Sequence, residues 1–172
     1  ACGVGFIASM HGKRNHDIVD KAILGLGCME HRGACSADDD SGDGAGVMTE
    51  IPWKLLASEM GDGVVEGKCG VGMIFLPQDE GEAQTCRDFI TRLAGERNFE
   101  VVGWRDVPVD RSVVGGLATD TEPQVEQIVV KGDFASYEEL DRELYILRKK
   151  IEQEVFEMYG PEDECYICLL YT

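Results

Sequence analysis

The sequence has few basic residues, few histidines and no apolar run long enough to span a membrane. Its 172 residues include 16 lysines and arginines against 33 aspartates and glutamates, which gives a net charge of −17. Because this charge repels phosphate groups, it argues against nucleic acid and against an anionic membrane as partners. Apolar residues still make up 44% of the chain, which is enough to form a core. We therefore expect an acidic globular protein with no nucleic-acid partner and no membrane partner.

Signals of export are also missing. The start of the chain has neither the basic segment nor the long apolar run of a secretory leader. It has no initiating methionine either, so we expect the true start to lie upstream of Ala1. The seven cysteines are an odd number at irregular spacings, which is unlike a disulfide framework. Both features favour a reducing compartment such as the cytoplasm.

Two short patterns resemble a zinc site and a dinucleotide site, and neither is complete. Cys165 and Cys168 have the spacing of a zinc-binding pair, but a zinc site needs a second pair or added histidines, and all three histidines precede residue 32. The glycines at Gly3 and Gly5 match part of a dinucleotide-binding fingerprint, which requires a preceding strand and a following helix. Neither is expected there. We predict no metal site and no cofactor-binding site in this segment.

Apolar patterning predicts alternating strands and helices. The last helix is the clearest, because Ser136 and Glu139 form a capping box and an apolar stripe follows. Its heptad spacing also allows a coiled coil, but we favour a helix packed on a sheet. The expected helices cover residues 18–29, 86–93 and 136–160, the first capped by Asn15 and ended by Gly33. The expected strands cover residues 2–8, 47–51, 69–77, 100–109, 124–131 and 164–171.

The glycine-rich acidic segment between Asp39 and Glu50 matches a calcium-binding loop. It places oxygen-bearing side chains at the first, third, fifth and twelfth positions and glycine at the sixth. The context fits poorly, since a strand-like stretch and Pro52 stand where a helix should continue. A calcium-binding regulatory module that uses this loop is therefore the less favoured hypothesis. The alternative is a polar loop whose glycines allow close backbone approach.

Cys2 is the strongest candidate for a catalytic residue. If Ala1 is removed, Cys2 carries both a thiol and a free α-amine, whose ordinary pKa of about 8 suits a general base. That amine can take the thiol proton, and the thiolate can then attack a carbonyl carbon. While Ala1 is attached, the nitrogen is an amide and has no such basicity. We therefore expect Ala1 to be discarded.

Several motifs together resemble one enzyme family. They are CGVGFIA from residue 2, CMEHRGACSADDDSGDGAG from residue 28, EIPW from residue 50, GVGMIFLP from residue 70 and GWRDVPVD from residue 103. They resemble the N-terminal glutaminase domain of glutamate synthases, most closely the ferredoxin-dependent branch of cyanobacteria and plastids. This class contains the glutamine amidotransferases with a terminal cysteine nucleophile. The resemblance implies that residues 1–172 are the N-terminal portion of such a domain.

The resemblance implies an α+β fold, the four-layer αββα sandwich of the N-terminal-nucleophile (Ntn) hydrolases, here incomplete. It implies that glutamine is hydrolysed through a thioester on Cys2 and that the ammonia serves glutamate synthesis from 2-oxoglutarate. An alternative is an Ntn amidohydrolase that acts on an amide other than glutamine. The full-length enzyme would use FMN and an iron–sulfur cluster, neither in this segment. The implied partners are glutamine, the remaining synthase domains and, through the whole enzyme, ferredoxin. The implied location is the cytoplasm, or the plastid stroma in a plastid-bearing organism.

Carried onto this chain, the resemblance gives Cys2 the nucleophile position and places Arg32 and Gly33 near it. A cation there would favour the thiolate, although Arg32 also suits the negative end of the preceding helix. His31 is the alternative base, less favoured because the terminal amine can serve. The family's later H-x-R and H-N-G-E segments, which bind substrate and form the oxyanion hole, do not occur here. We expect this fragment alone to be inactive.

The last five residues depart from the family pattern. Family members continue after Ile167 with a serine-rich turn, whereas this chain has CLLYT at residues 168–172. One back-translation of this pentapeptide reads like a transposon-end sequencing adapter. Our hypothesis is that residues 168–172 are an artefact of the sequencing library. The genomic reading frame tests it, because an encoded CLLYT at this position would refute it.

Overall fold

The computed structural model describes residues 3–38, 41–160 and 165–172. The chain divides into two compact units, each described separately below. The first comprises residues 1–50 and 110–121, and the second comprises residues 51–109 and 122–172. Within the described residues, no helix combines the length and apolar character needed to cross a membrane.

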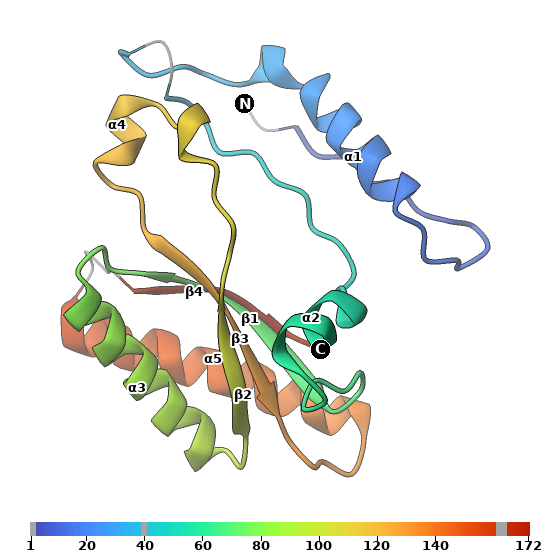
Figure 1. Cartoon of the computed structure of the whole chain (residues 1–172), viewed down its shortest axis with the longest axis vertical. Helices are drawn as coiled ribbons and strands as arrows, with labels where there is room; N and C mark the ends of the chain where they lie inside the picture. The colour runs from blue at the N-terminus through green and yellow to red at the C-terminus, as the bar shows by residue number, and fades with distance from the viewer. Residues whose placement is uncertain (1–2, 39–40, 161–164) are drawn as a thin grey trace. The chain divides into compact units, whose positions relative to one another are not determined.

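The second unit is built on a four-stranded antiparallel sheet (Figure 1). Its strands are β1 (Cys69–Leu76), β2 (Glu100–Asp106), β3 (Gln124–Lys131) and β4 (Tyr166–Tyr171). They lie in the order β2-β3-β1-β4, so β1 and β3 are central. In the β1–β3 pair Cys69 lies opposite Lys131 and Leu76 lies opposite Gln124. The strands predicted at these four places are confirmed, because each apolar run finds a neighbour that accepts its backbone hydrogen bonds.

Two long helices cover one face of this sheet (Figure 1). They are α3 (Glu80–Glu96) and α5 (Tyr137–Tyr159). The Ser136 hydroxyl accepts a hydrogen bond from the Glu139 amide at 3.2 Å, which confirms the predicted cap. The apolar stripe of α5 packs on the sheet, so the coiled-coil alternative is wrong. The buried residues of α5 are Leu140, Leu144, Leu147, Ile151 and Val155.

A shorter helix covers part of the opposite face. This helix, α2 (Trp53–Met60), buries Leu56 completely against a small cluster that includes Val71 and Val129. The sequence pattern did not predict α2. Its eight residues offer barely two turns, too short for an apolar period to be distinguished from a loop. The second unit therefore has three layers, with the sheet in the middle.

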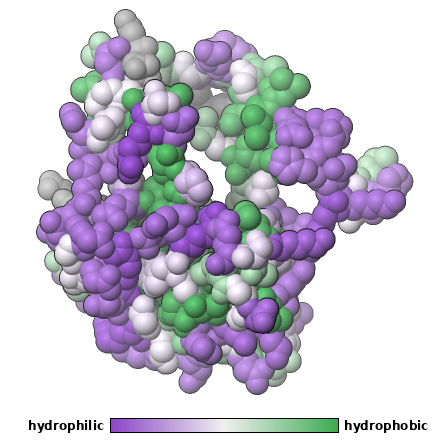
Figure 2. Space-filling view, in the orientation of Figure 1, coloured by the Kyte–Doolittle hydropathy of each residue, from purple (hydrophilic) through white to green (hydrophobic). Residues whose placement is uncertain are grey.

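The first unit has little regular structure. It contains α1 (Asp17–Gly27), the short 3-10 helices η1 (Glu30–Arg32) and η2 (Arg111–Val113), and α4 (Gly116–Thr119). The predicted helix over residues 18–29 is confirmed, but it ends at Gly27, before Gly33. Asn15 lies one residue ahead of the N-cap and accepts a hydrogen bond from the Asp17 amide at 3.1 Å. Apolar side chains of α1 are exposed, and Figure 2 shows hydrophobic surface over this helix.

Two predicted strands are not formed. Residues 3–8 and 47–51 have no regular structure. Val4 and Phe6 are each 94% exposed, and Met48 is 78% exposed. An extended apolar segment becomes a strand only where another strand pairs with its backbone groups. Among the described residues neither segment has such a neighbour, so both predictions were wrong for that reason. Cys2, which was included in the first predicted strand, lies outside the described residues.

Candidate functional site

Arg32 packs against the residue that follows Cys2. A Cβ atom placed on Gly3 would lie 3.4 Å from Arg32 Cδ and 3.7 Å from Arg32 Nε. It would lie only 2.8 Å from Met29 Sδ, so a side chain at position 3 would collide with this group. A side chain at position 3 would therefore require Met29 to move, and η1 brings the Arg32 side chain close to Gly3, which follows Cys2 in the sequence. Cys2 itself lies outside the described residues.

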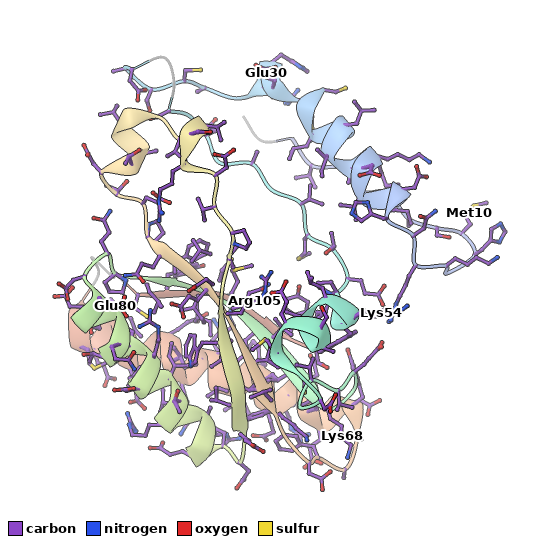
Figure 3. All side chains as sticks on the ribbon, viewed as in Figure 1. Met10, Glu30, Lys54, Lys68, Glu80 and Arg105 are labelled. Atoms are coloured by element: carbon purple, nitrogen blue, oxygen red, sulfur yellow. The ribbon has the colours of Figure 1, made fainter. Side chains whose placement is uncertain are left out.

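The turn that carries Arg32 is held by its own backbone. The Gly33 amide donates to the Glu30 carbonyl at 2.9 Å, and a Cβ on Gly33 would lie 3.3 Å from that oxygen. Glu30 opens the turn and is labelled in Figure 3. The ring of His31 is exposed, and its Nδ1 lies 3.1 Å from the Cys28 carbonyl oxygen. With Nδ1–H donating to this carbonyl, only Nε2 of His31 remains to act as a base.

The loop after Gly33 closes on itself. The Ala34 amide donates to Asp43 Oδ2 at 3.0 Å, and the Asp43 amide donates to the Ala34 carbonyl at 3.1 Å. Cys35 and Gly42 form an isolated antiparallel bridge. A Cβ on Gly42 would lie 2.8 Å from the Ala34 carbonyl oxygen, so only glycine fits beside that strand-like pairing. The two ends of the loop, Ala34 and Asp43, are thus held together directly after Gly33.

The same loop also binds the start of α4. Asp38 accepts hydrogen bonds from the Ser41 hydroxyl at 2.6 Å and from the Leu117 amide at 3.3 Å. Ser41 Oγ in turn accepts from the Ala118 amide at 3.3 Å. These bonds satisfy amides at a helix start that have no partner within the helix. The sequence analysis missed this role, although aspartate three residues before serine is typical of a side-chain-stabilised turn.

The calcium-loop hypothesis is not supported by these contacts. Its fifth-position ligand, Asp43, binds the Ala34 amide, and its twelfth, Glu50, forms an ion pair of 2.6 Å with Arg14. Ser41, at the third position, binds Asp38. Asp39, at the first position, lies outside the described residues. The carboxylates that are described thus face backbone amides and an arginine, and the described residues contain no cluster able to hold a metal ion.

The two cysteines at zinc-like spacing do not face one site. Cys165 is buried in the main core with Ile167, whereas Cys168 is only half-buried at the irregularity in the β1–β4 register. No residue of β1 is paired with Cys168, because the register shifts there and interrupts the alternation of side chains along β4. The predicted strand reading of this segment is confirmed. Residues 169–171 pair with β1, and the artefact hypothesis for residues 168–172 stays a prediction.

Comparison with known proteins identifies the family to which the chain belongs. The family model of the class-II glutamine amidotransferases matches residues 2–172. The chain belongs to this family. The expected Ntn-hydrolase fold of α+β class agrees with the mixed helices and antiparallel sheet of the second unit. The described residues contain one sheet, whereas a complete four-layer αββα sandwich contains two.

Several ferredoxin-dependent glutamate synthases are similar to this chain. The chain is 45% identical over 176 residues to ferredoxin-dependent glutamate synthase 2 of Synechocystis, covering 98% of this chain and 11% of that protein. It is 47% identical over 162 residues to the chloroplastic ferredoxin-dependent glutamate synthase 2 of Arabidopsis thaliana, covering 90% and 10%. The chloroplastic enzyme of Oryza sativa subsp. japonica is 43% identical, with 99% and 11% covered. The chain spans about a tenth of the length of these relatives.

Proposed function

We propose that this chain carries the nucleophile of a glutaminase that supplies ammonia to glutamate synthesis. In this reaction the Cys2 thiolate attacks the side-chain amide carbon of glutamine and forms a γ-glutamyl thioester. Ammonia leaves, and water then hydrolyses the thioester to glutamate and restores the thiol. A second part of the polypeptide would use the ammonia with 2-oxoglutarate. The observation that most supports this proposal is the contact of Arg32 with Gly3, next to Cys2.

The cation would act on the protonation state of the nucleophile. A positive charge close to a thiol stabilises the thiolate, which is the reactive form. The free α-amine of Cys2 would accept the thiol proton once Ala1 is removed, and a positioned base of this kind typically contributes about 10²–10⁴ in rate. In this proposal Gly33 keeps η1 in place, and Arg32 and the amine together set the reactivity of Cys2.

Within the described residues, the glycines and the metal-binding residue types do not match the usual sites of a redox cofactor. Gly70 and Gly72 lie within β1, whereas a dinucleotide fingerprint requires glycines between a strand and a helix. The described cysteines, histidines and carboxylates form no group that could hold a metal or a cluster. We therefore assign FMN, the iron–sulfur cluster and the ferredoxin contact to other parts of a longer polypeptide. The chloroplastic relatives favour the plastid stroma, with the cytoplasm as the alternative.

The test uses the full-length enzyme with Cys2→Ala. Glutamine-dependent glutamate synthesis should be abolished, while synthesis from added ammonia should be retained, because ammonia bypasses the thioester. Cys28→Ala is the matched control, since Cys28 is an exposed cysteine of the same unit, and it should retain both activities. If Cys2→Ala lost both activities together, Cys2 would act through folding and the proposal would fail.

A further inference from the structure

Two side chains of the loop that follows Gly33 bind backbone amides of α4, far along the sequence. Asp38 Oδ2 accepts a hydrogen bond from the Leu117 amide, and Ser41 Oγ accepts one from the Ala118 amide, each at 3.3 Å. The paired residues are 79 and 77 positions apart. All four residues belong to the first unit, so the bonds lie within one compact body. We refer to these two bonds as the Asp38–α4 contact.

The hydroxyl of Ser41 has a fixed direction within this contact. It donates to Asp38 Oδ2 at 2.6 Å, so its lone pairs are left to accept from the Ala118 amide. The Ser41 amide donates to the other carboxylate oxygen of Asp38 at 2.9 Å. Ser41 is only 8% exposed. Because a buried hydroxyl or amide without a partner is costly, the carboxylate holds its donors in one arrangement.

The segment that receives these bonds is ordered by hydrogen bonds of its own. The Asp110 carboxylate accepts from the Ser112 amide at 3.0 Å and from the Ser112 hydroxyl at 2.6 Å. The Gly115 carbonyl accepts from the Thr119 amide at 3.0 Å and from the Thr119 hydroxyl at 3.1 Å. These bonds stabilise η2 and α4, so α4 can serve as a support for the loop.

Backbone bonds connect the Asp38–α4 contact to the turn that carries Arg32. The Ser41 carbonyl accepts from the Ser36 amide at 2.7 Å. Ala34 and Asp43 exchange two hydrogen bonds, at 3.0 and 3.1 Å. Ala34 lies only two residues after Arg32, so these bonds hold the backbone on the C-terminal side of η1. This matters because η1 buries none of its residues and is not held by a core.

We propose that Asp38 is a positioning residue that, through the Asp38–α4 contact, keeps the Arg32 side chain beside Gly3 and therefore close to the nucleophile. This inference rests on the proposed function, in which Cys2 attacks glutamine. Asp38 has no chemical role in it and acts only through the backbone of the loop. The contact between Arg32 and Gly3 is the feature that Asp38 preserves.

The charge of Asp38 and its position predict opposite effects of its removal. If only charge mattered, Asp38→Ala would favour the Cys2 thiolate, because a negative group would be lost from the same unit. If Asp38 positions Arg32, the variant should disfavour the thiolate, because the cation is no longer held near it. Ser41→Ala breaks the same contact without changing any charge. Both variants should therefore reduce the reactivity of Cys2.

The experiment uses full-length enzyme from which Ala1 has been removed. Alkylation of Cys2 by iodoacetamide near neutral pH should slow roughly threefold in Asp38→Ala and in Ser41→Ala, as for a thiol pKa raised by about half a unit. Glutamine-dependent synthesis should fall by a similar factor, while ammonia-dependent synthesis is retained. Asp20→Ala is the matched control, since Asp20 is an exposed carboxylate of α1, and it should change neither rate. An unchanged or faster alkylation in both variants would overturn the proposal.

A double variant tests whether Asp38 acts through Arg32. In an Arg32→Met background, Asp38→Ala should cause no further slowing of Cys2 alkylation, because no guanidinium remains to be positioned. Additive slowing would overturn the proposal, and so would an Arg32→Met enzyme that is alkylated at the parent rate. Amide hydrogen exchange in α1 should equal that of the parent in both single variants. If Asp38→Ala loosens α1, Ser41→Ala in the same two backgrounds decides the question.

Cys2→Ala in the same two synthesis assays separates this inference from the proposed function. Loss of glutamine-dependent synthesis alone in Cys2→Ala, with parental behaviour of Asp38→Ala and Ser41→Ala, would refute only the role of Asp38. Loss of both syntheses in Cys2→Ala would refute the proposed function itself.

Discussion

Arg87 of α3 holds the carboxylate of Glu126 on β3 with three hydrogen bonds, the shortest being 2.6 Å from Nη2 to Oε1. The two side chains are 13% and 6% exposed, so the pair is desolvated beneath the helix. Arg87 also contacts Glu80 at 2.8 Å at the rim. These contacts raise the pKa of Arg87, chiefly through the hydrogen bonds to Glu126. The pair ties α3 to a central strand.

Removing one partner should therefore leave a buried charge without compensation. We predict that Arg87→Met lowers the free energy of unfolding by about 3–5 kcal/mol, measured by urea denaturation. The matched control is Arg92→Met on the same helix, whose pair with Glu96 is about half exposed, at 53% and 47%. Such surface pairs contribute about 0–1 kcal/mol. Equal losses of unfolding free energy in the two variants would show that the buried Arg87–Glu126 pair contributes no more to stability than an exposed pair.

Gly70 permits α5 to lie close to β1. A Cβ at this position would be 2.4 Å from Leu144 Cδ2 and 2.6 Å from Leu144 Cδ1. We predict that Gly70→Ala destabilises the protein by about 1–3 kcal/mol through overpacking, and that the double variant with Leu144→Ala loses less stability than the sum of the two single losses. Gly95→Ala in α3 is the control, because a Cβ there meets nothing within 4 Å. It should be neutral or stabilising by up to about 1 kcal/mol, since alanine favours helix.

Much of the second unit could be predicted from the sequence, because its signals are local. The apolar run of β3 and the capped stripe of α5 coincide with the elements found. The failures have non-local causes. Residues 3–8 have the composition of a strand but no partner strand among the described residues. The bond from the Leu117 amide to Asp38 joins positions 79 residues apart, which no spacing rule detects.

The candidate site likewise has features that the sequence predicts and features that only the folded structure shows. Arg32 could be singled out from a family motif, and its contact with Gly3 depends on how η1 folds back toward the start of the chain. The acidic loop was ambiguous, since the same carboxylates suit a calcium ion or backbone amides. Only the partners of Asp43 and Glu50 decide between these alternatives.

Acid should weaken the attachment of α2 to β2. Arg105, labelled in Figure 3, donates hydrogen bonds to Glu59 and so lowers the pKa of this carboxylate. A carboxylate with a lowered folded-state pKa adds stability above its ordinary pKa, and this stability is lost as the pH falls through the folded-state value. We predict that Glu59→Gln flattens the fall of stability below about pH 4.5, measured by urea denaturation at several pH values. Exposed Glu100→Gln is the control and should leave the slope unchanged.

The final prediction concerns the role proposed for Arg32. If its guanidinium stabilises the Cys2 thiolate, then Arg32→Met should raise the pKa of the Cys2 thiol, by about 1–3 units for a cation in close range. In full-length enzyme with Ala1 removed, alkylation of Cys2 by iodoacetamide should then slow at least roughly tenfold near neutral pH. The two rates should converge once the pH exceeds both pKa values, because both thiols are then ionised.

Arg14→Met is the matched control for this measurement. Arg14 is a cation of the same unit that is paired with Glu50 at 2.6 Å, so its removal should leave the Cys2 alkylation profile unchanged. Arg32→Lys should keep most of the effect, since it retains the charge while losing the planar group. A lysine variant that behaves like the methionine variant would mean that the shape of the guanidinium matters more than its charge. An unchanged alkylation profile in Arg32→Met would leave Arg32 only its other role, as a positive charge favoured at the end of the preceding helix.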